Sequence, residues 1–142
     1  MGISDLMKTR VIQNILLIED DVWLARALEQ VLLKSGFAVR VFKNGKHALE
    51  SLARERTDLV ITDIYMEDMD GMEVIRAVKK SFPKAKIIAI SGGSRVIDLD
   101  WLPMARLLGA DRAFEKPIEM EDLLKAIDDL DAELAPIPVS GN

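Results

Sequence analysis

Short apolar runs alternate five times with helical patterns along this chain, and this alternation restricts its fold more than any other feature. The apolar runs cover 15–18, 38–42, 59–61, 86–90 and 112–115, and apolar residues recur at three- and four-residue steps over 22–34, 46–56, 72–82, 101–108 and 119–134. A short apolar run that ends at charged or turn residues is typical of a strand covered on both faces. Strands that alternate with helices predict an α/β fold, a parallel sheet with helices on both sides.

The size and composition of the chain predict one folded domain. Its 142 residues are enough for one buried core and too few for two. The formal net charge of −5 disfavours nucleic acid as a partner, and the lack of cysteine excludes disulfides and thiolate chemistry. No apolar run is long enough to span a membrane, and residues 1–12 have no signal-peptide core. We therefore expect a cytoplasmic protein with a domain at 13–134, an N-terminal extension at 1–12 and a flexible C-terminal tail at 135–142.

Acidic, hydroxyl and basic side chains stand where the predicted strands end. In a parallel sheet these carboxyl ends lie along one edge, and such folds bind their ligands there. The first, third, fourth and fifth strands are followed by three acids, one acid, a hydroxyl with two glycines, and a lysine: Glu19, Asp20, Asp21, Asp63, Ser91, Gly92, Gly93 and Lys116. The sequence therefore predicts a cluster of carboxylates with one hydroxyl and one ammonium group.

Such a cluster needs a counter-charge. Two carboxylates about 4 Å apart repel each other by roughly 4 kcal/mol at an effective dielectric constant of about 20. Glu19, Asp20 and Asp63 together therefore require either a cation or raised pKa values. A hard cation such as Mg²⁺ takes oxygen ligands, and Lys116 supplies a second positive charge. With Ser91 to bond one phosphoryl oxygen, the set suits phosphoryl transfer with in-line attack by a carboxylate.

Taken singly, these residues have simpler explanations. Asp20 and Asp21 stand at the start of a helix, where acids are favoured by capping and by the helix dipole. Asp63 could be a turn residue, and Ser91 could belong to an ordinary loop. Together with Lys116 they occur at four separate strand ends, and this joint occurrence favours the functional interpretation.

These segments resemble the receiver domains of response regulators over about residues 13–134. Residues 15–21 are similar to the acidic opening of that family, 62–71 to its phosphorylation-site segment, 88–92 to its switch Ser/Thr segment, and 109–111 and 114–117 to its closing lysine–proline segment. The resemblance implies a stand-alone receiver with a flavodoxin-like, doubly wound five-stranded sheet in the order 2-1-3-4-5 and five helices.

The resemblance also implies the ligands of the site. Asp63 would accept a phosphoryl group from a sensor histidine kinase or a histidine phosphotransfer protein. Asp20, Asp63 and the main-chain carbonyl of Tyr65 would bind Mg²⁺, or Mn²⁺ in its place, and Glu19 would act through a metal-bound water.

Two further residues have roles in the family pattern. Ser91 would be the switch hydroxyl, and Lys116 would bond the phosphoryl group, next to a peptide bond to Pro117 that is commonly cis in the family. Such a chain would catalyse only its own phosphorylation and dephosphorylation. It would act on a downstream protein, which the sequence does not identify, through the face built from the fourth helix, fifth strand and fifth helix.

Three features depart from the family pattern. Glu67 stands where a proline is usual, Ala113 stands where the family has its aromatic switch residue, with Phe114 next to it, and the stretch 91–116 is a few residues long. The usual coupling of hydroxyl to aromatic ring therefore cannot operate in its ordinary form.

Other functions are weighed against the same residues. An aspartyl phosphohydrolase typically has an Asp two residues after its nucleophile, where this chain has Tyr65. A flavin-binding domain needs a phosphate cradle after the first strand, which Glu19 and Asp20 would oppose. A degenerate receiver, acting as a phosphorylation-independent interaction module, is the main alternative, which Ala113 favours and Asp63 opposes.

Two further features are given ordinary interpretations. His47 is the sole histidine, which we expect to be exposed, so a phosphohistidine donor has to come from another chain. The acidic run at 128–131 is interpreted as a solvated helix face, with a docking surface as the alternative.

Overall fold

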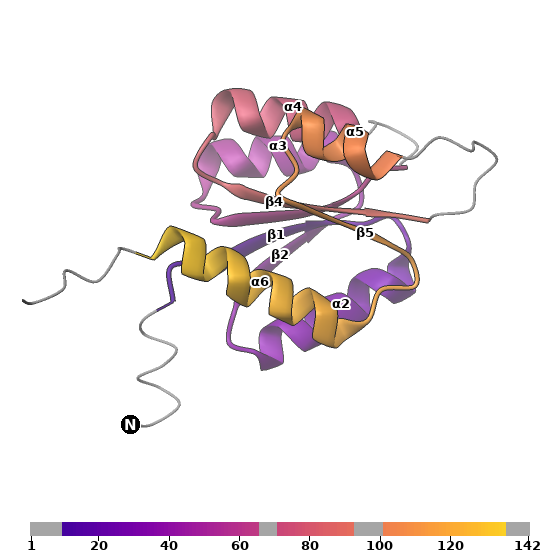
Figure 1. Ribbon diagram of the computed structural model, residues 1–142, viewed down its shortest axis with the longest axis vertical. Coiled ribbons are helices and arrows are strands. Elements are labelled where there is room, and N and C mark those ends of the chain that lie inside the picture. The colour runs from indigo at the N-terminus through magenta and orange to yellow at the C-terminus, as the bar shows by residue number, and fades with distance from the viewer. Residues whose placement is uncertain (1–9, 66–70, 93–100, 136–142) are drawn as a thin grey trace, which may run out of the picture.

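The computed structural model describes residues 10–65, 71–92 and 101–135, with the side chains of 101 and 102 excepted (Figure 1). Within these residues one parallel sheet has the strand order β2-β1-β3-β4-β5. The strands are β1 (Asn14–Ile18), β2 (Ala38–Phe42), β3 (Leu59–Asp63), β4 (Lys86–Ser91) and β5 (Arg112–Glu115). The helices are α2 (Val22–Lys34), α3 (Gly45–Arg54), α4 (Gly71–Ser81), α5 (Trp101–Leu108) and α6 (Met120–Leu134). The predicted fold and strand order are confirmed, and helix ends differ from prediction by at most two residues.

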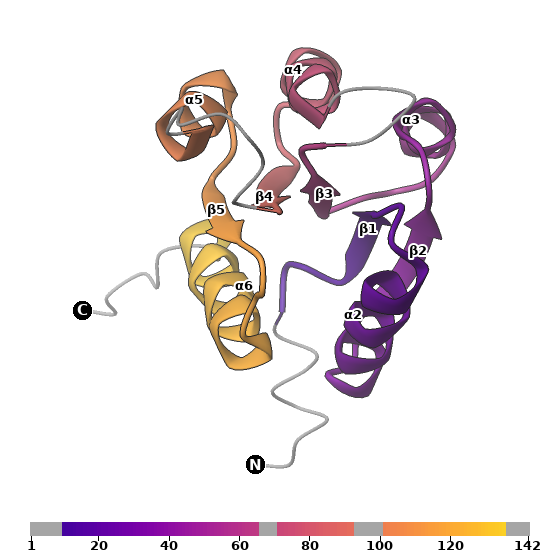
Figure 2. The ribbon, with the colours of Figure 1, turned by 90° about the vertical axis from the view of Figure 1, so that its right-hand side faces the viewer.

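Helices cover both faces of the sheet, as Figure 2 shows in a view onto the carboxyl ends of the strands. Helices α3, α4 and α5 lie on one side, and α2 and α6 lie on the other. Alternate residues of β1 follow this division, because Leu16 and Ile18 pack in one core cluster and Ile15 and Leu17 pack in the other. Burial on both faces explains why the strand is a continuous apolar run.

Helix starts follow from local side-chain chemistry. The Asp21 carboxylate accepts hydrogen bonds from the amides of Trp23 and Leu24, which caps α2. The Asn44 side chain accepts from the amide of His47 in the same way at α3. Gly36, after α2, has a φ of 96°, a conformation that glycine adopts without strain. The side-chain caps at Asp21 and Asn44 therefore mark where α2 and α3 begin, whereas Glu119 makes no such hydrogen bond at the start of α6.

Residues 10–12, predicted to belong to an N-terminal extension, pack against the domain. The Ile12 side chain is fully buried. One carboxylate oxygen of Asp131 accepts from the amides of Val11 and Ile12 at 2.8 and 2.7 Å. Asp131 therefore attaches the segment at Val11 and Ile12 to α6. The preceding Asp128 and Asp129 are exposed, as expected for a solvated face.

None of the helices in the described part of the chain is both long and apolar enough to cross a membrane. Two features of the sequence analysis, Glu67 and most of the loop after Ser91, lie outside the described residues.

Candidate functional site

Three acidic side chains meet at the carboxyl ends of β1 and β3. Glu19, Asp20 and Asp63 each offer a carboxylate oxygen, and these oxygens lie within 4.8 Å of one another. Glu19 and Asp63 are buried, whereas Asp20 is exposed. The parallel pairing of β1 with β3 brings the strand ends together, with Ile18 opposite Thr62. The sequence places all three acids at one end of the sheet, and the structure brings their oxygens close enough to share one cation.

Lys116 reaches this cluster from the segment after β5. Its Nζ lies 3.0 Å from Glu19 Oε1 and 3.2 Å from Asp63 Oδ2. The peptide bond between Lys116 and Pro117 is cis, the form expected from the family pattern. One ammonium group therefore bridges two nearly buried carboxylates.

Burial and neighbouring charges alter the proton affinity of Glu19 and of Lys116. Burial, together with the charge of Asp63, raises the pKa of Glu19 to about 7, although the Asp21 amide and Lys116 act in the opposite direction. Burial alone would lower the pKa of Lys116, but its hydrogen bond to Glu19 and the charge of Asp63 outweigh it, so the pKa is raised. Lys116 is therefore positively charged, and the pKa of Glu19 lies near neutral pH.

The hydroxyl of Ser91 is buried at the end of β4. Its Oγ has no hydrogen-bond partner among the described residues. A buried hydroxyl without a partner costs free energy, which an oxygen entering the site would recover. The Ser91 carbonyl accepts from the Lys116 amide at 2.7 Å, so the β4–β5 ladder ties the hydroxyl to the lysine.

Close backbone packing holds Asp63 in place. A Cβ on Gly71 would lie 2.2 Å from the carbonyl oxygen of Asp63 and 2.5 Å from Ile64 Cα. The Gly71 amide donates to the Ile64 carbonyl at 2.8 Å. The residue types around Gly71 do not predict this contact, because a close approach of two backbones leaves no local sequence signal.

Tyr65 lies two residues beyond Asp63 and is partly exposed. Its amide donates to Asp63 Oδ1 at 3.2 Å. The predicted role of its carbonyl as a metal ligand remains a prediction.

Ala113 and Phe114 point to opposite sides of β5. Ala113 packs against the cluster beneath α3, α4 and α5, and Phe114 packs against the cluster beneath α2 and α6. Phe114 therefore cannot take the place of an aromatic ring at position 113, and the departure from the family pattern holds in three dimensions.

The donor set suits a hard divalent cation. All three side-chain candidates, Glu19, Asp20 and Asp63, are carboxylates, and such oxygen donors favour Mg²⁺ or Mn²⁺ over softer metals. The exposure of Asp20 leaves one side of the cluster open to solvent, where a metal ion can keep bound water.

Comparison with known proteins gives one consistent result. The family model described as the response regulator receiver domain matches residues 15–128. The response regulator receiver protein CpdR of Brucella abortus (strain 2308) is 37% identical over 119 residues, which cover 82% of this chain and 94% of CpdR. The transcriptional regulatory protein GlrR of Escherichia coli (strain K12) is 32% identical over 123 residues, or 87% of this chain and 27% of GlrR. The chain thus spans about a quarter of the length of the transcriptional regulators that it matches.

Solved structures give the same result. A CheY-like receiver domain protein from Methanospirillum hungatei JF-1 matches with a TM-score of 0.79 at 27% identity, covering 86% of this chain and 95% of that one. The response regulator TrrA from Thermotoga maritima, solved in complex with Mg²⁺-BeF, matches with a TM-score of 0.74 at 26% identity, covering 84% and 99%.

Proposed function

This chain belongs to the family of response regulator receiver domains, which serve phosphorylation-based two-component signalling, and on that premise we propose that it accepts a phosphoryl group on Asp63. The observation that carries the proposal is the position of the Asp63 carboxylate, buried beside Lys116 and among two further acids. The unpartnered Ser91 hydroxyl at the end of the neighbouring strand supports it.

Asp63, Lys116 and Ser91 have different roles in the transfer. An Asp63 oxygen attacks phosphorus in line, and the bond from phosphorus to the donor nitrogen or oxygen breaks as the new bond forms. Lys116 exchanges its contact with Asp63 for one with a phosphoryl oxygen, and the Ser91 hydroxyl donates to another. Both groups neutralise negative charge on oxygens that would otherwise enter an already acidic site.

Glu19, Asp20 and Asp63 are the residues that would hold Mg²⁺, with the Tyr65 carbonyl as a further ligand. The metal ion, when bound, neutralises charge on the oxygens of the phosphoryl group during transfer. Mn²⁺ fits the same donors.

We expect the phosphodonor to be a sensor histidine kinase or a histidine phosphotransfer protein. The one histidine of this sequence, His47, is exposed on α3, and its described hydrogen bonds are with Asn44. For output, the exposed Met104 and Leu107 on α5 support a protein-binding face formed by α5, β5 and α6. Phosphorylation would shift the population of conformations of that face.

Labelling with a small acyl phosphate tests the proposal. The purified chain is incubated with acetyl phosphate and Mg²⁺, and its intact mass is measured. We expect the mass of one added phosphoryl group in the wild type. No such group should be added when a chelator is present during the incubation, or in Asp63→Asn. Asp129→Asn, which alters an exposed acid on α6, is the matched control and should label like the wild type.

The same experiment separates the alternative function. A degenerate receiver, which Ala113 favours, would take up no phosphoryl group although it folds normally. Equal labelling of wild type and Asp63→Asn would contradict the assignment of Asp63.

A further inference from the structure

An asparagine is followed directly by a glycine at the start of α3. The sequence contains three asparagines, Asn14, Asn44 and Asn142, and of these only Asn44 precedes a glycine. The side-chain amide of an asparagine can be attacked by the backbone nitrogen of the next residue, and the side chain of that next residue crowds the attack. Because Gly45 has no side chain, Asn44 is the asparagine of this sequence that is least shielded from the reaction.

The folded chain holds Asn44 in a conformation that opposes this reaction. Ring closure requires the Gly45 nitrogen to rotate towards the Asn44 side chain, whereas the backbone of Asn44 is extended, with a ψ of 154°. The side-chain oxygen of Asn44 accepts from the His47 amide at 2.9 Å, and its side-chain nitrogen lies 3.2 Å from His47 Nδ1. His47 therefore contacts both polar atoms of the reactive group, and these contacts must break before the ring can close.

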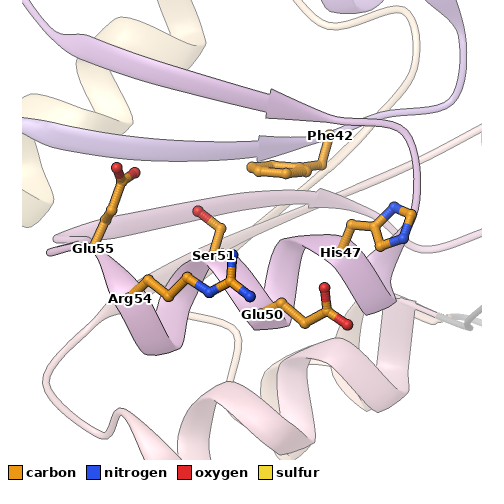
Figure 3. Close-up of a pocket in the computed structure, with 6 residues that line it drawn as sticks. All are labelled: Phe42, His47, Glu50, Ser51, Arg54 and Glu55. Atoms are coloured by element: carbon orange, nitrogen blue, oxygen red, sulfur yellow. The ribbon is translucent and has the colours of Figure 1, made fainter.

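The contacts that hold Asn44 lie at the surface of the molecule. His47 is exposed, and it borders a cavity of about 360 Å³ beside α3, whose other lining residues are Phe42, Glu50, Ser51, Arg54 and Glu55 (Figure 3). The His47 side chain can therefore move away from Asn44 without displacing a core side chain. Local opening at an exposed helix end costs less free energy than global unfolding.

We propose that Asn44 is a modification site, at which the chain deamidates without an enzyme through states in which the first turn of α3 is open. The Gly45 nitrogen bonds to Asn44 Cγ, the bond from Cγ to the side-chain nitrogen breaks, and ammonia leaves with the proton that the Gly45 nitrogen loses. Water then opens the cyclic imide. Attack of water at Cγ gives aspartate at position 44, and attack at the main-chain carbonyl carbon gives isoaspartate, in which the backbone runs through Cγ.

The two products differ in their effect on α3. Aspartate keeps a side-chain oxygen that can accept from the His47 amide, and aspartate caps helices as well as asparagine does. Isoaspartate adds one carbon atom to the backbone before Gly45, which moves the carboxylate out of the capping position and leaves the His47 amide without its acceptor. Both products place a new negative charge after β2, at the edge of the sheet that carries the acidic cluster.

Incubation of the full chain at pH 8 tests the proposal. One sample is folded in buffer and one is unfolded in guanidinium chloride, and mass spectrometry with electron-transfer fragmentation locates the new acid and separates aspartate from isoaspartate. We expect Asn44 to convert at least about tenfold faster in guanidinium chloride than in buffer, because unfolding removes the contacts with His47. Asn14, followed by the β-branched Ile15, is the internal control and should convert at least about tenfold more slowly than Asn44 in the unfolded sample.

Substitution of Gly45 tests the chemistry apart from the fold. Gly45→Ala should slow conversion of Asn44 at least about tenfold in guanidinium chloride, where its effect on the folded structure plays no part. Gly36→Ala, the same change at a glycine that follows a serine, is the matched control and should leave the unfolded rate unchanged.

A helix-weakening substitution tests the route through local opening. Lys46→Gly lowers the stability of the first turn of α3 and should speed conversion in buffer about threefold, with no change in guanidinium chloride. Lys125→Gly, an equal change at an exposed lysine of α6, is the matched control and should leave the rate in buffer unchanged.

Hydrogen exchange at the His47 amide tests the effect of each product. Asn44→Asp carries one product directly and should exchange this amide as slowly as the wild type. The isoaspartate form, separated from the incubated chain by chromatography, should exchange it at least about tenfold faster.

Several outcomes would overturn the proposal. Conversion of Asn44 no faster than that of Asn14 in the unfolded chain would remove the chemical basis, and equal rates for Asn44 in buffer and in guanidinium chloride would remove the role of the fold. Equal acceleration by Lys46→Gly and Lys125→Gly would show that conversion requires global unfolding. An isoaspartate form whose His47 amide still exchanges slowly would contradict the effect on α3.

Discussion

Gly71 is the residue at which the backbone around Asp63 leaves least room. A methyl group there would meet the carbonyl of Asp63 and the Cα of Ile64, both of them backbone atoms that cannot rotate away. The strain would fall on the end of β3, which carries the proposed phosphoacceptor.

We therefore predict that Gly71→Ala lowers the free energy of unfolding by about 2 kcal/mol and slows acyl-phosphate labelling of Asp63. Urea denaturation and intact mass measure the two effects. Ser81→Ala, at the exposed end of the same helix, should change neither. Normal stability and labelling in Gly71→Ala would contradict the packing described here.

Lys116 compensates two acids at once, because its ammonium group contacts both Glu19 and Asp63. Lys116→Met leaves Glu19 and Asp63 without their shared counter-charge, so we expect a loss of about 2 kcal/mol of stability in chelator at pH 8. The loss should shrink at pH 5, where Glu19 is protonated because its pKa is about 7. Urea denaturation at both pH values measures it, with Lys125→Met on α6 as the exposed control. A loss independent of pH would count against the coupling of these charges.

Asp131 joins α6 to the segment that contains Val11 and Ile12. Its carboxylate accepts from two backbone amides, one of them that of the fully buried Ile12. Asp131→Ala should therefore cost about 1–3 kcal/mol, because it leaves a buried amide without a partner. Asp128→Ala, on the exposed face of the same helix, should stay within about 0.5 kcal/mol of wild type. Equal effects of the two substitutions in urea denaturation would show that the acidic run acts only as a solvated face.

The contrast between neighbouring acids marks what the sequence can predict. The run Ile15 to Ile18 predicts a buried strand because burial on both faces requires continuous apolar residues. The end of each parallel strand then locates Asp63 and Lys116 without further information. In contrast, nothing local distinguishes Asp131 from Asp128, since their difference depends on a segment 119 and 120 residues away.

The same limit applies to the site. Residue types at strand ends predict that Glu19, Asp20 and Asp63 meet, because topology alone brings them together. The bridging geometry of Lys116 and the tight approach at Gly71 depend on side-chain conformers and backbone spacing of the folded state. The residues that meet at the site are thus predictable from strand order, whereas their detailed contacts depend on packing in the folded state.

For the whole molecule, opposite charges gather at separate elements. The segment 34–56 around β2 and α3 is basic, whereas α6 holds one Lys among its acids: Glu121, Asp122, Asp128, Asp129, Asp131 and Glu133. Figure 2 shows α3 and α6 on opposite faces and near opposite edges of the sheet. Electrostatic attraction alone would therefore direct oppositely charged partners to these two parts of the molecule.

The acidic cluster should make the stability of the whole fold depend on pH and on metal together. The pKa of Glu19 is raised to about 7 from 4.5, so the folded state binds its proton more strongly than the unfolded state. That contribution is complete below the unfolded pKa and is lost as pH rises through about 7. The raised pKa of Lys116 lies far above this range, so its contribution stays constant across it.

We therefore predict that the metal-free chain loses about 2 kcal/mol of unfolding free energy between pH 5 and pH 8, and that Glu19→Gln flattens this fall. Glu121→Gln, on the exposed face of α6, should leave it intact. Millimolar Mg²⁺ should raise the free energy of unfolding more at pH 8 than at pH 5, because protons compete with the metal for the same carboxylates. Urea denaturation at both pH values, with Mg²⁺ and with chelator, measures all of these quantities. A Mg²⁺ effect of equal size at the two pH values, or one that persists in a variant with Asp20→Asn and Asp63→Asn together, would mean that the metal stabilises the fold from elsewhere.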